Sequence, residues 1–578
     1  MKASDYIVKF FEEKKVEIVF GYIGGMITHL VDSIHKNKNV KFVQTYHEQS
    51  AAIAAEGYAR ETQNIGVAIS TSGPGATNMM TGIANAYFDS IPVIYITGQV
   101  NTYDYKYNKP IKQQGFQETD IISIVKPITK YAKLIDNSEK LVEELEKAYE
   151  IATTGRKGPV LLDIPLNIQR ANIELIKKIE IESKDKILDN LDMLEKTLDI
   201  VKNSKAPILL IGGGFISENA KELLEEFVKK TGIPVVNSLL GKGCFSELEN
   251  EHMGLIGSYG NRCANIAVYN SDCLLTLGSR LDLRQTGNFL EKFSENKKII
   301  HVDIDEKEMK YSRLKNKINL KIRAKDYLNY LNDNICDFKI SESWKNYLKN
   351  LKENYSQAKE IEKNVENKMP YEIIDLVNKY SKEGDIITAD IGQNQMWAAQ
   401  YLKIKKDQKW YTSGGLAPMG YSLPAAVGAA FANKGNDVFA IMGDGGFHMS
   451  TQSLMLISQY NLPVKVIVLN NNALGMITQF QELYFQNVTA GTTNSGGYYV
   501  PNLENMAKSY NLKYFKLDKK NMFDNIYLDK IFKIKNAIIE VILEGETRVY
   551  PKLEYDCSIE NTSPKLSEEE LKKLKFKK

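Results

Sequence analysis

The sequence predicts an α/β protein built from three doubly wound parallel-sheet domains. Short, almost wholly apolar segments alternate with helical patterns along the chain, and this alternation is typical of parallel sheets covered by helices on both faces. A chain of 578 residues is also too long for one hydrophobic core. Two polar, charged stretches, 174–186 and 343–368, separate the apolar blocks and divide the chain into three parts.

The three parts follow one another in the order of their strands. Residues 1–172 open with an amphipathic helix and continue through EIVFGYI, KFVQTY, IGVAIS and IPVIYITG. Residues 187–335 contain PILLIGGGF, IPVVNSL, DCLLTLGSR and KIIHVDID, and residues 367–550 contain DIITADIG, VFAIMGDGG, VKVIVLNNN and AIIEVIL. Residues 551–578 form a tail whose basic end, KKLKFKK, we expect to be a solvated terminus.

Composition excludes several classes of function. The 75 basic and 72 acidic residues leave a net charge of +3, which gives no general attraction to nucleic acid or to a membrane surface. No apolar run approaches the roughly 18 residues of a membrane span. The N-terminal helix contains Asp5, Glu12 and Glu13, which a signal peptide would not tolerate. The 5 scattered cysteines are expected to be reduced thiols in a cytoplasmic protein, and the 6 dispersed histidines give no transition-metal motif.

The segment GDGGFHMSTQSLMLISQYNLPVKVIVLNNN, 443–472, carries the strongest chemical signal. Asp444 and Asn471 each follow an apolar strand, and ligands of open α/β sheets bind beyond the carboxyl ends of the strands. Carboxylate and amide oxygens suit Mg²⁺, and Gly443 and Gly445 allow the backbone to approach a phosphate. The alternative is an aspartate in a β-turn and an asparagine-rich loop. The spacing of one β-α-β step favours a metal–diphosphate site.

This pattern, GDG followed by NN, resembles the signature of thiamine diphosphate (ThDP) enzymes, and the whole chain resembles the acetolactate synthase branch of that family. The resemblance implies pyrimidine-binding, central FAD-binding-like and diphosphate-binding domains. It implies that Mg²⁺ is held by Asp444, Asn471 and the carbonyl of Ala473. It further implies that the diphosphate end of the cofactor lies beside Gly392, Gln393, Asn394, Gly443, Gly445 and Gly446, with Asn394 standing where the family commonly has histidine.

The motif HEQ places Glu48 at the start of an alanine-rich helix. A glutamate there could simply complement the helix dipole. The resemblance instead implies that the Glu48 carboxyl bonds the N1′ atom of the cofactor pyrimidine and so helps the cofactor to lose its C2 proton. It places Gly24 and Gln117 near the reacting centre. It also assigns to Met419 the bending of the cofactor, although a methionine that fills the core is the usual alternative.

The central domain resembles the FAD-binding part of acetolactate synthases. Taken singly, its motifs are common turns and helix caps. The resemblance implies FAD contacts from Gly212, Gly213, Gly214, Arg280, Asp303 and Asp305. TSGPGATN, 71–78, is rich in small residues but lacks the lysine of a phosphate-binding P-loop, which disfavours nucleotide hydrolysis.

Four further residues are expected to face the substrates: Phe116, Arg284, Met476 and Phe480. Arg284 matches the arginine that receives the carboxylate of the second 2-oxo acid, and a surface arginine is the alternative. Phe480 stands where the synthases have a tryptophan that favours 2-oxobutyrate, and Leu166 replaces a usual lysine. These departures leave the acceptor open.

The first hypothesis is decarboxylation of pyruvate followed by carboligation to a second 2-oxo acid, in a homodimer or homotetramer with active sites between subunits. The second transfers the pyruvate-derived unit to another carbonyl, such as a nucleotide-linked keto-sugar. The third is a flavin-dependent oxidase of the pyruvate oxidase type. A non-enzymic binding subunit would require the glutamate or the metal pair to be missing, and both are present.

Overall fold

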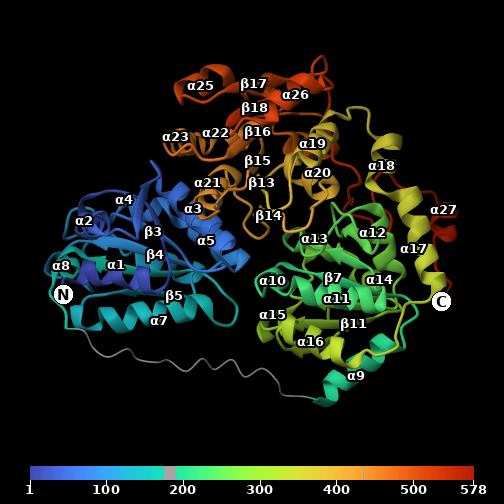
Figure 1. The fold of residues 1–578 in the computed structure, drawn as a ribbon, viewed down its shortest axis with the longest axis horizontal. Helices are drawn as coiled ribbons and strands as arrows, with labels where there is room; N and C mark the ends of the chain where they lie inside the picture. Colours follow the sequence, from blue (N-terminus) through green and yellow to red (C-terminus); the bar gives the residue numbers. More distant parts are fainter. Residues whose placement is uncertain (175–190, 434, 578) are drawn as a thin grey trace.

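The computed structural model describes residues 1–174, 191–433 and 435–577. It contains three six-stranded sheets in which every strand pair between named strands is parallel. Helices cover both faces of each sheet, and the three domains lie at the corners of a triangle (Figure 1). The predicted fold class is therefore confirmed. The charged segment 174–186, interpreted as a linker, lies outside the described residues apart from Glu174.

The N-terminal domain has the strand order β2-β1-β3-β4-β6-β5. Its strands are β1 (Ile18–Tyr22), β2 (Lys41–Gln44), β3 (Gly66–Ser70), β4 (Val93–Gln99), β5 (Tyr131–Leu134) and β6 (Val160–Pro165). Its helices are α1 (Ala3–Glu13), α2 (Thr28–Lys36), α3 (Glu48–Thr62), α4 (Pro74–Asn78), α5 (Met80–Asp89), α6 (Ile121–Val125), α7 (Leu141–Thr153) and α8 (Leu166–Arg170). The strands β3, β4 and β6 are buried throughout, which explains why their sequences are almost continuously apolar.

The central domain has the strand order β12-β11-β10-β7-β8-β9. Its strands are β7 (Pro207–Ile211), β8 (Val235–Asn237), β9 (His252–Leu255), β10 (Cys273–Leu277), β11 (Lys298–Asp303) and β12 (Ile318–Lys321). Its helices are α9 (Leu191–Lys202), α10 (Gly213–Ile216), α11 (Lys221–Thr231), α12 (Arg262–Asn270), α13 (Leu283–Thr286), α14 (Leu290–Ser294), α15 (Glu306–Tyr311) and α16 (Ala324–Asn334). If the strands are numbered 1 to 6 within the domain, their order is 6-5-4-1-2-3. This is the order 3-2-1-4-5-6 of dinucleotide-binding sheets read from the opposite edge.

The C-terminal domain has the strand order β14-β13-β15-β16-β18-β17. Its strands are β13 (Ile386–Ala389), β14 (Lys409–Thr412), β15 (Val438–Gly443), β16 (Val464–Asn470), β17 (Tyr514–Leu517) and β18 (Ala537–Ile542). Its helices are α19 (Met369–Tyr380), α20 (Gln393–Tyr401), α21 (Ser422–Ala432), α22 (Asp444–His448), α23 (Leu454–Gln459), α24 (Gly475–Tyr484), α25 (Leu503–Ser509) and α26 (Asn525–Phe532). Numbered within the domain, the order is 2-1-3-4-6-5, the same as in the N-terminal domain.

The C-terminal tail and the first helix of the polar connection 343–368 lie against the central domain, and the second helix of the connection also packs on the C-terminal domain. The connection forms α17 (Glu342–Tyr355) and α18 (Gln357–Asn364), and the tail ends in α27 (Glu568–Lys573) (Figure 1). The expectation of a solvated terminus is wrong in part. Leu574 and Phe576 pack against the buried Trp344, because the basic residues alternate with apolar ones that face the central core. None of the helices within the described ranges is long and apolar enough to cross a membrane.

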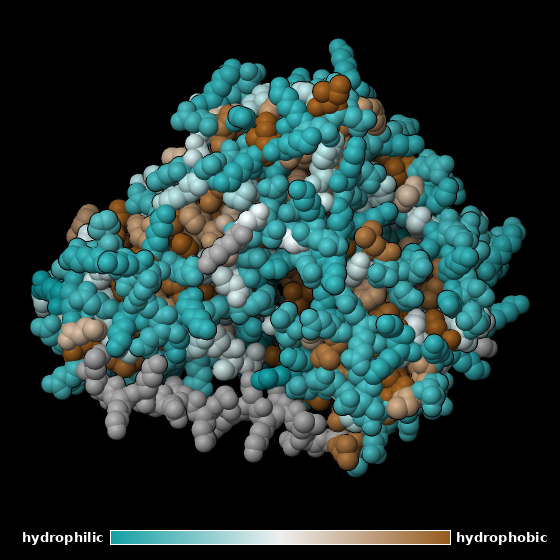
Figure 2. All heavy atoms as spheres, in the orientation of Figure 1, coloured by the Kyte–Doolittle hydropathy of each residue, from teal (hydrophilic) through white to brown (hydrophobic). Residues whose placement is uncertain are grey.

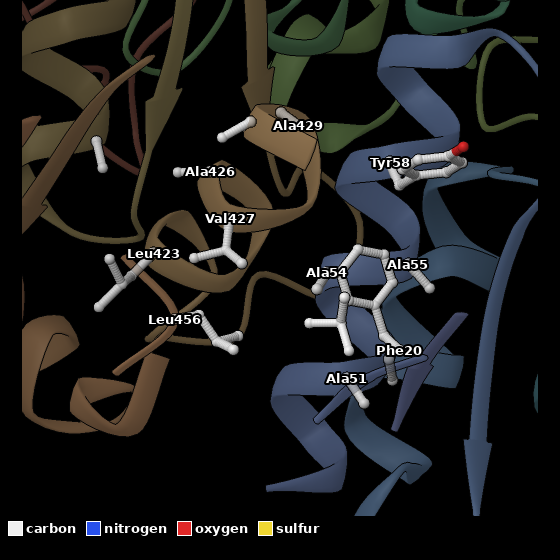
Figure 3. Close-up of a cluster of buried hydrophobic side chains, with 14 of the residues drawn as sticks. Phe20, Ala51, Ala54, Ala55, Tyr58, Leu423, Ala426, Val427, Ala429 and Leu456 are labelled. Carbon is white, nitrogen blue, oxygen red and sulfur yellow. The ribbon is translucent and has the colours of Figure 1, made fainter. Parts of the chain in front are cut away.

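The N- and C-terminal domains meet through α3 and α21, whose small residues share one apolar cluster (Figure 3). Ala51, Ala54 and Ala55 come from α3, and Ala426 and Ala429 from α21. A Cβ atom added at Gly57 would lie 2.2 Å from the carbonyl oxygen of Ala425, and one added at Gly428 would lie 1.9 Å from that of Ala54. The two backbones therefore approach so closely that only glycine fits at these two positions.

Gly428→Ala is expected to destabilise this contact. The added methyl group meets backbone atoms that cannot rotate away, and overpacking of this kind costs about 1–3 kcal/mol. We expect a thermal unfolding midpoint lower by several degrees, measured by circular dichroism. Gly25→Ala is the matched control, because a Cβ atom there has no neighbour within 4 Å among the residues that the structure describes. Equal midpoints for the two variants would contradict this account of the helix crossing.

Candidate active site

The topological switch point of the C-terminal sheet collects most of the predicted cofactor residues. The strand order reverses between β13 and β15, and ligands of open α/β sheets bind in the crevice beyond the carboxyl ends of such strands. Gly392 follows β13, Asp444 follows β15, and Asn471 follows the neighbouring β16. The fold therefore brings together at one edge of the sheet residues that are far apart in the sequence.

Asp444 is a buried carboxylate with an unused oxygen. Its Oδ1 atom accepts hydrogen bonds from the Tyr498 hydroxyl at 2.9 Å and from the Gly445 N–H at 2.7 Å. Its Oδ2 atom is buried and has no hydrogen-bond partner among the described residues. Burial raises the pKa of this carboxyl to about 6. A buried carboxylate oxygen without a partner is costly, and a bound cation would satisfy it.

Asn471 is held in place by its amide nitrogen. The Nδ2 group donates to Thr547 Oγ1 at 2.9 Å, and the Oδ1 atom accepts from the Ala473 N–H at 3.2 Å. Gln393 lies behind this pair, where its Oε1 atom accepts from Thr547 Oγ1 at 2.8 Å and its Nε2 group donates to the Thr547 carbonyl at 3.0 Å. The Gln393 side chain thus supports Asn471. The donor set of one carboxylate, one amide and a nearby backbone segment fits a hard cation such as Mg²⁺.

The start of α20 supplies the second part of this crevice. Gly392 has a φ of 135°, a conformation that favours glycine, and it directly precedes the first helical residue. The Asn394 amide donates to the Asp390 carbonyl at 2.7 Å. Its oxygen lies 3.4 Å from where a Cβ atom of Gly443 would be. Gly392, Asn394 and Gly443 therefore line a gap between the ends of β13 and β15, beside a helix N-terminus that favours anions.

The Met419 segment borders the same crevice. The Met419 methyl group lies 3.0 Å from where a Cβ atom of Gly445 would be, and a Cβ atom at Gly446 would lie 2.5 Å from Asp390 Oδ1. The buried Asp390 carboxylate accepts from the N–H groups of Gly420 and Ser422, each at 2.9 Å. Asp390 thus joins the end of β13 to the turn that carries Met419. Because Gly445 and Gly446 have no side chains, Met419 can approach the first of them and the Asp390 carboxylate can approach the second.

The N-terminal domain gathers its three predicted catalytic residues around the loop after β3. A Cβ atom at Gly24 would meet Thr71 at 2.5 Å, one at Gly75 would lie 3.1 Å from Glu48 Oε1, and one at Gly73 would lie 3.1 Å from Gln117 Cβ. Glu48 is the first residue of α3 and is buried. Its Oε2 atom accepts from the Asn78 amide at 3.0 Å. This is the switch point of the N-terminal sheet, between β1 and β3.

The turn that carries Phe116 and Gln117 is shaped by one buried carboxylate. Glu118 accepts hydrogen bonds from the backbone N–H groups of Lys106 at 2.8 Å, Gln114 at 2.7 Å and Gly115 at 3.0 Å. This arrangement turns Phe116 outward, and its side chain is 79% exposed. An aromatic ring in that position is available to a ligand or to a second protein surface.

The central domain places its predicted residues at its own switch point, between β7 and β10. The Gly214 N–H donates to the Gly278 carbonyl at 2.9 Å, and a Cβ atom at Gly212 would lie 2.1 Å from that carbonyl oxygen. A cavity of about 200 Å³ opens beside these glycines and is lined by residues of all three domains, among them Gly213, Gly214, Arg280 and Asp303. The surface in Figure 2 is hollowed where the domains meet, and hydrophobic side chains lie in the hollow.

The two predicted aspartates after β11 differ in their surroundings. Asp303 lines the cavity, and burial raises the pKa of its carboxyl. The Asp305 side chain caps α15 by accepting from the N–H groups of Lys307 and Glu308, and it pairs with Arg156 at 3.1 Å. Asp305 thus has the helix-capping role that is the general alternative for an acid after a strand. A flavin contact of Asp305 stays a prediction.

Three of the four predicted substrate residues lie along one path. The Arg284 guanidinium lies 5.8 Å from the centre of the Tyr259 ring, and the Tyr259 hydroxyl lies 3.5 Å from Met476 Sδ. Phe480 follows Met476 by one helical turn on α24 and is half-exposed. Arg284 also lines the cavity between the domains. Phe116 belongs to the N-terminal domain and is not part of this path.

The residues of these sites that were not predicted from the sequence include Asn78, Asp390, Tyr498 and Thr547. Asp390 carries the same signal as Asp444, an acid directly after an apolar strand, and could have been found by it. Asn78 ends the segment TSGPGATN, which the sequence singled out without a role for this residue. Tyr498 and Thr547 carry no local signal, because each reaches its partner only through the folded chain.

Together, the fold and these sites define the chain as a thiamine pyrophosphate enzyme, and family models of that class match it in order. The match covers the N-terminal TPP binding domain over residues 1–124, the central domain over 194–331 and the C-terminal TPP binding domain over 390–541. The predicted class of enzyme is thereby confirmed.

Within this class, the chain belongs to the acetolactate synthase family. It is 34% identical to the acetolactate synthase large subunit of Lactococcus lactis, over 95% of this chain and 94% of that protein. It is 35% identical to a probable acetolactate synthase large subunit of Methanocaldococcus jannaschii, over 94% of this chain and 92% of that protein. Identity to the chloroplastic acetolactate synthase of Arabidopsis thaliana is 36%, over 84% of this chain and 72% of that protein.

Proposed function

We propose that the protein decarboxylates pyruvate and joins the remaining two-carbon unit to a second 2-oxo acid, with thiamine diphosphate and Mg²⁺ as cofactors. The observation that carries the proposal is the pair of switch points in two domains of identical strand order. One presents the Glu48 carboxyl, and the other presents the unused oxygen of Asp444. When bound, thiamine diphosphate supplies a carbon nucleophile and stabilises the charge left by the loss of CO₂.

In this proposal Asp444, Asn471 and the Ala473 carbonyl hold Mg²⁺, and Gly392, Asn394, Gly443, Gly445 and Gly446 surround the diphosphate. The Glu48 carboxyl holds the proton that it shares with the pyrimidine ring, and the Asn78 amide keeps that carboxyl in place. Met419 would support the bound cofactor from the turn held by Asp390. Gly24 and Gln117 border the reacting centre.

FAD is the proposed occupant of the cavity between the three domains. The central sheet has the strand order of dinucleotide-binding folds, and Gly212, Gly213 and Gly214 lie at its switch point, where such sheets bind a pyrophosphate. Arg280 and Asp303 line the cavity beside them. The chemistry of the proposed reaction needs no electron acceptor, so the flavin has a structural role in this proposal.

A homodimer, or a tetramer made of two dimers, is the proposed assembly. Within one chain, Glu48 contacts Asn78 of its own domain and Asp444 contacts Tyr498 of its own domain. Apolar side chains remain exposed near both switch points, including Ile23, Phe116, Met449, Phe480 and Tyr499. A second copy would cover them and bring the Glu48 end of one subunit to the Asp444 end of the other.

The cytoplasm is the proposed location, since all of the cysteines are free thiols, as expected in a reducing compartment.

The nature of the acceptor is tested by product analysis. With pyruvate, Mg²⁺, thiamine diphosphate and FAD alone, we expect acetolactate with one CO₂ for every two pyruvates consumed, quantified by NMR and by CO₂ release. Release of CO₂ that stays slow until a nucleotide-linked keto-sugar is added would instead support that acceptor. Oxygen uptake with peroxide formation would support an oxidase. Either result would contradict acetolactate formation as the main activity.

A further inference from the structure

A largely buried ionic cluster lies in the N-terminal domain where it meets the C-terminal domain. Arg60 of α3 contacts Glu56 Oε1 at 2.8 Å and Asp89 Oδ2 at 3.0 Å, and both carboxylate side chains are 0% exposed. Asn85 donates to the second Glu56 oxygen at 2.7 Å. Two carboxyls thus share one guanidinium, and burial raises the pKa of both. Buried ion pairs add little stability compared with apolar packing. The cluster therefore matters mainly for the groups that it holds in place.

The cluster fixes both ends of the segment that carries Met419. At the first end, Asp89 accepts from the N–H groups of Gly414 at 3.2 Å and Gly415 at 2.8 Å. Ser413 donates to Asn85 and accepts from the Ala417 N–H. At the second end, the Tyr421 hydroxyl donates to Glu56 Oε1 at 3.1 Å. Apart from the bond between Ser413 and Ala417, each of these contacts joins an N-terminal group to the C-terminal domain.

The first end of the segment packs closely against two other domains. A Cβ atom at Gly414 would lie 2.7 Å from Leu240 of the central domain, and one at Gly415 would lie 2.5 Å from Phe88 Cβ. The glycines therefore bring the backbone directly onto Asp89. Arg60, Asp89 and Gly414 also line the cavity between the three domains.

We infer that the Glu56–Arg60–Asp89 cluster positions residues 413–421, and through them the Met419 side chain, so that the N-terminal domain sets the shape of the cofactor crevice in its own C-terminal domain. The inference rests on the role proposed above for Met419. Asp390 holds the same segment from the opposite side through Gly420 and Ser422. The Met419 turn is thus held between carboxylates of two domains. Toward thiamine diphosphate these cluster members are positioning residues, because they reach that cofactor only through the segment.

Asp89→Asn tests the inference, because it keeps the shape of the side chain but removes the charge that orders the cluster. We expect kcat to fall at least about tenfold, while the KM for pyruvate and the affinity for Mg²⁺ and thiamine diphosphate change less than about threefold, since those groups are held elsewhere. Glu360→Gln is the matched control. It breaks another buried ion pair, Arg262–Glu360 at 2.8 Å, in the central part of the molecule, and should leave kcat unchanged.

A second readout does not depend on activity. In protein labelled with ¹³C-methyl methionine, the Met419 signal, assigned by its loss in Met419→Leu, should shift or broaden in Asp89→Asn and stay in place in Glu360→Gln. If Asp89→Asn does not fold, Tyr421→Phe removes only the hydroxyl that reaches Glu56 and should move the same signal. An unmoved Met419 signal in the folded variant would overturn the inference.

A double-mutant cycle separates this inference from the proposed function. If Asp89 acts through Met419, the loss of kcat caused by Asp89→Asn should largely vanish in a Met419→Ala background. Full additivity would overturn the inference. A Met419→Ala variant with unchanged kcat would instead overturn the role of Met419 in the proposed function and, with it, the premise of the inference. The NMR result would still report whether the cluster positions the segment.

Discussion

Glu48→Gln should lower turnover by about 100- to 10,000-fold, the range typical of losing a general acid–base group. Glutamine keeps the size of the side chain and can still meet the Asn78 amide, but it cannot hold a proton for a pyrimidine nitrogen. Cofactor binding should persist, because the proposed Mg²⁺ and diphosphate contacts belong to the other switch point. The measurement is steady-state CO₂ release from pyruvate, together with the thiamine diphosphate content of the purified variant.

Glu144→Gln is the matched control for this experiment. Glu144 is also a buried glutamate of the N-terminal domain, but it lies on α7 and accepts from the Tyr131 hydroxyl. We expect nearly full activity from this variant. If Glu48→Gln were as active as Glu144→Gln, the catalytic role of Glu48 would be refuted.

Asp444→Ala should instead weaken the binding of Mg²⁺ and thiamine diphosphate. The change removes the unused buried oxygen and leaves Asn471 as the only remaining side-chain ligand in the proposed metal site. Loss of a group that merely orients a metal ligand costs about 10- to 100-fold in affinity, so loss of the ligand itself should cost at least about 100-fold. Calorimetric titration of Mg²⁺ and thiamine diphosphate measures the loss directly.

Tyr498→Phe gives the graded comparison for Asp444→Ala. It removes one hydrogen bond at 2.9 Å and leaves both carboxylate oxygens in place. Loss of a group that orients a metal ligand costs about 10- to 100-fold in affinity, so this variant should bind more weakly than the unmodified protein but more tightly than Asp444→Ala. An Asp444→Ala variant that bound Mg²⁺ and cofactor as tightly as the unmodified protein would exclude Asp444 as a ligand.

Local sequence patterns were sufficient for the fold class. Buried parallel strands such as β15 and β16 must be apolar along their whole length, so their sequences reveal them. Local patterns could not predict the strand order, because it depends on contacts between distant segments. The identical order of the N- and C-terminal sheets, which gives the two switch points their symmetry, became visible only in the folded chain.

The site residues also divide into those that a local sequence pattern reveals and those that it does not. Asp444, Asn471 and Glu48 stand directly after strands or at the start of a helix, so position and residue type pointed to them. The residues that hold them, such as Tyr498 and Thr547, are 54 and 76 positions away from their partners, and no pattern spans that distance. The tail was misjudged for a related reason. Leu574 and Phe576 find an apolar surface on α17 that a local reading of basic residues cannot reveal.

Subunit complementation tests the central claim most directly. Glu48→Gln and Asp444→Ala subunits should each be inactive alone. In an equal mixture, half of the subunit pairs contain one subunit of each variant. If the Glu48 carboxyl of one copy serves the metal site of the other, each of these mixed pairs contains one intact site out of two. The account predicts recovery of about a quarter of the unmodified activity after unfolding and refolding the two variants together. A mixture as inactive as its components, with mixed pairs demonstrated by mass spectrometry, would contradict it.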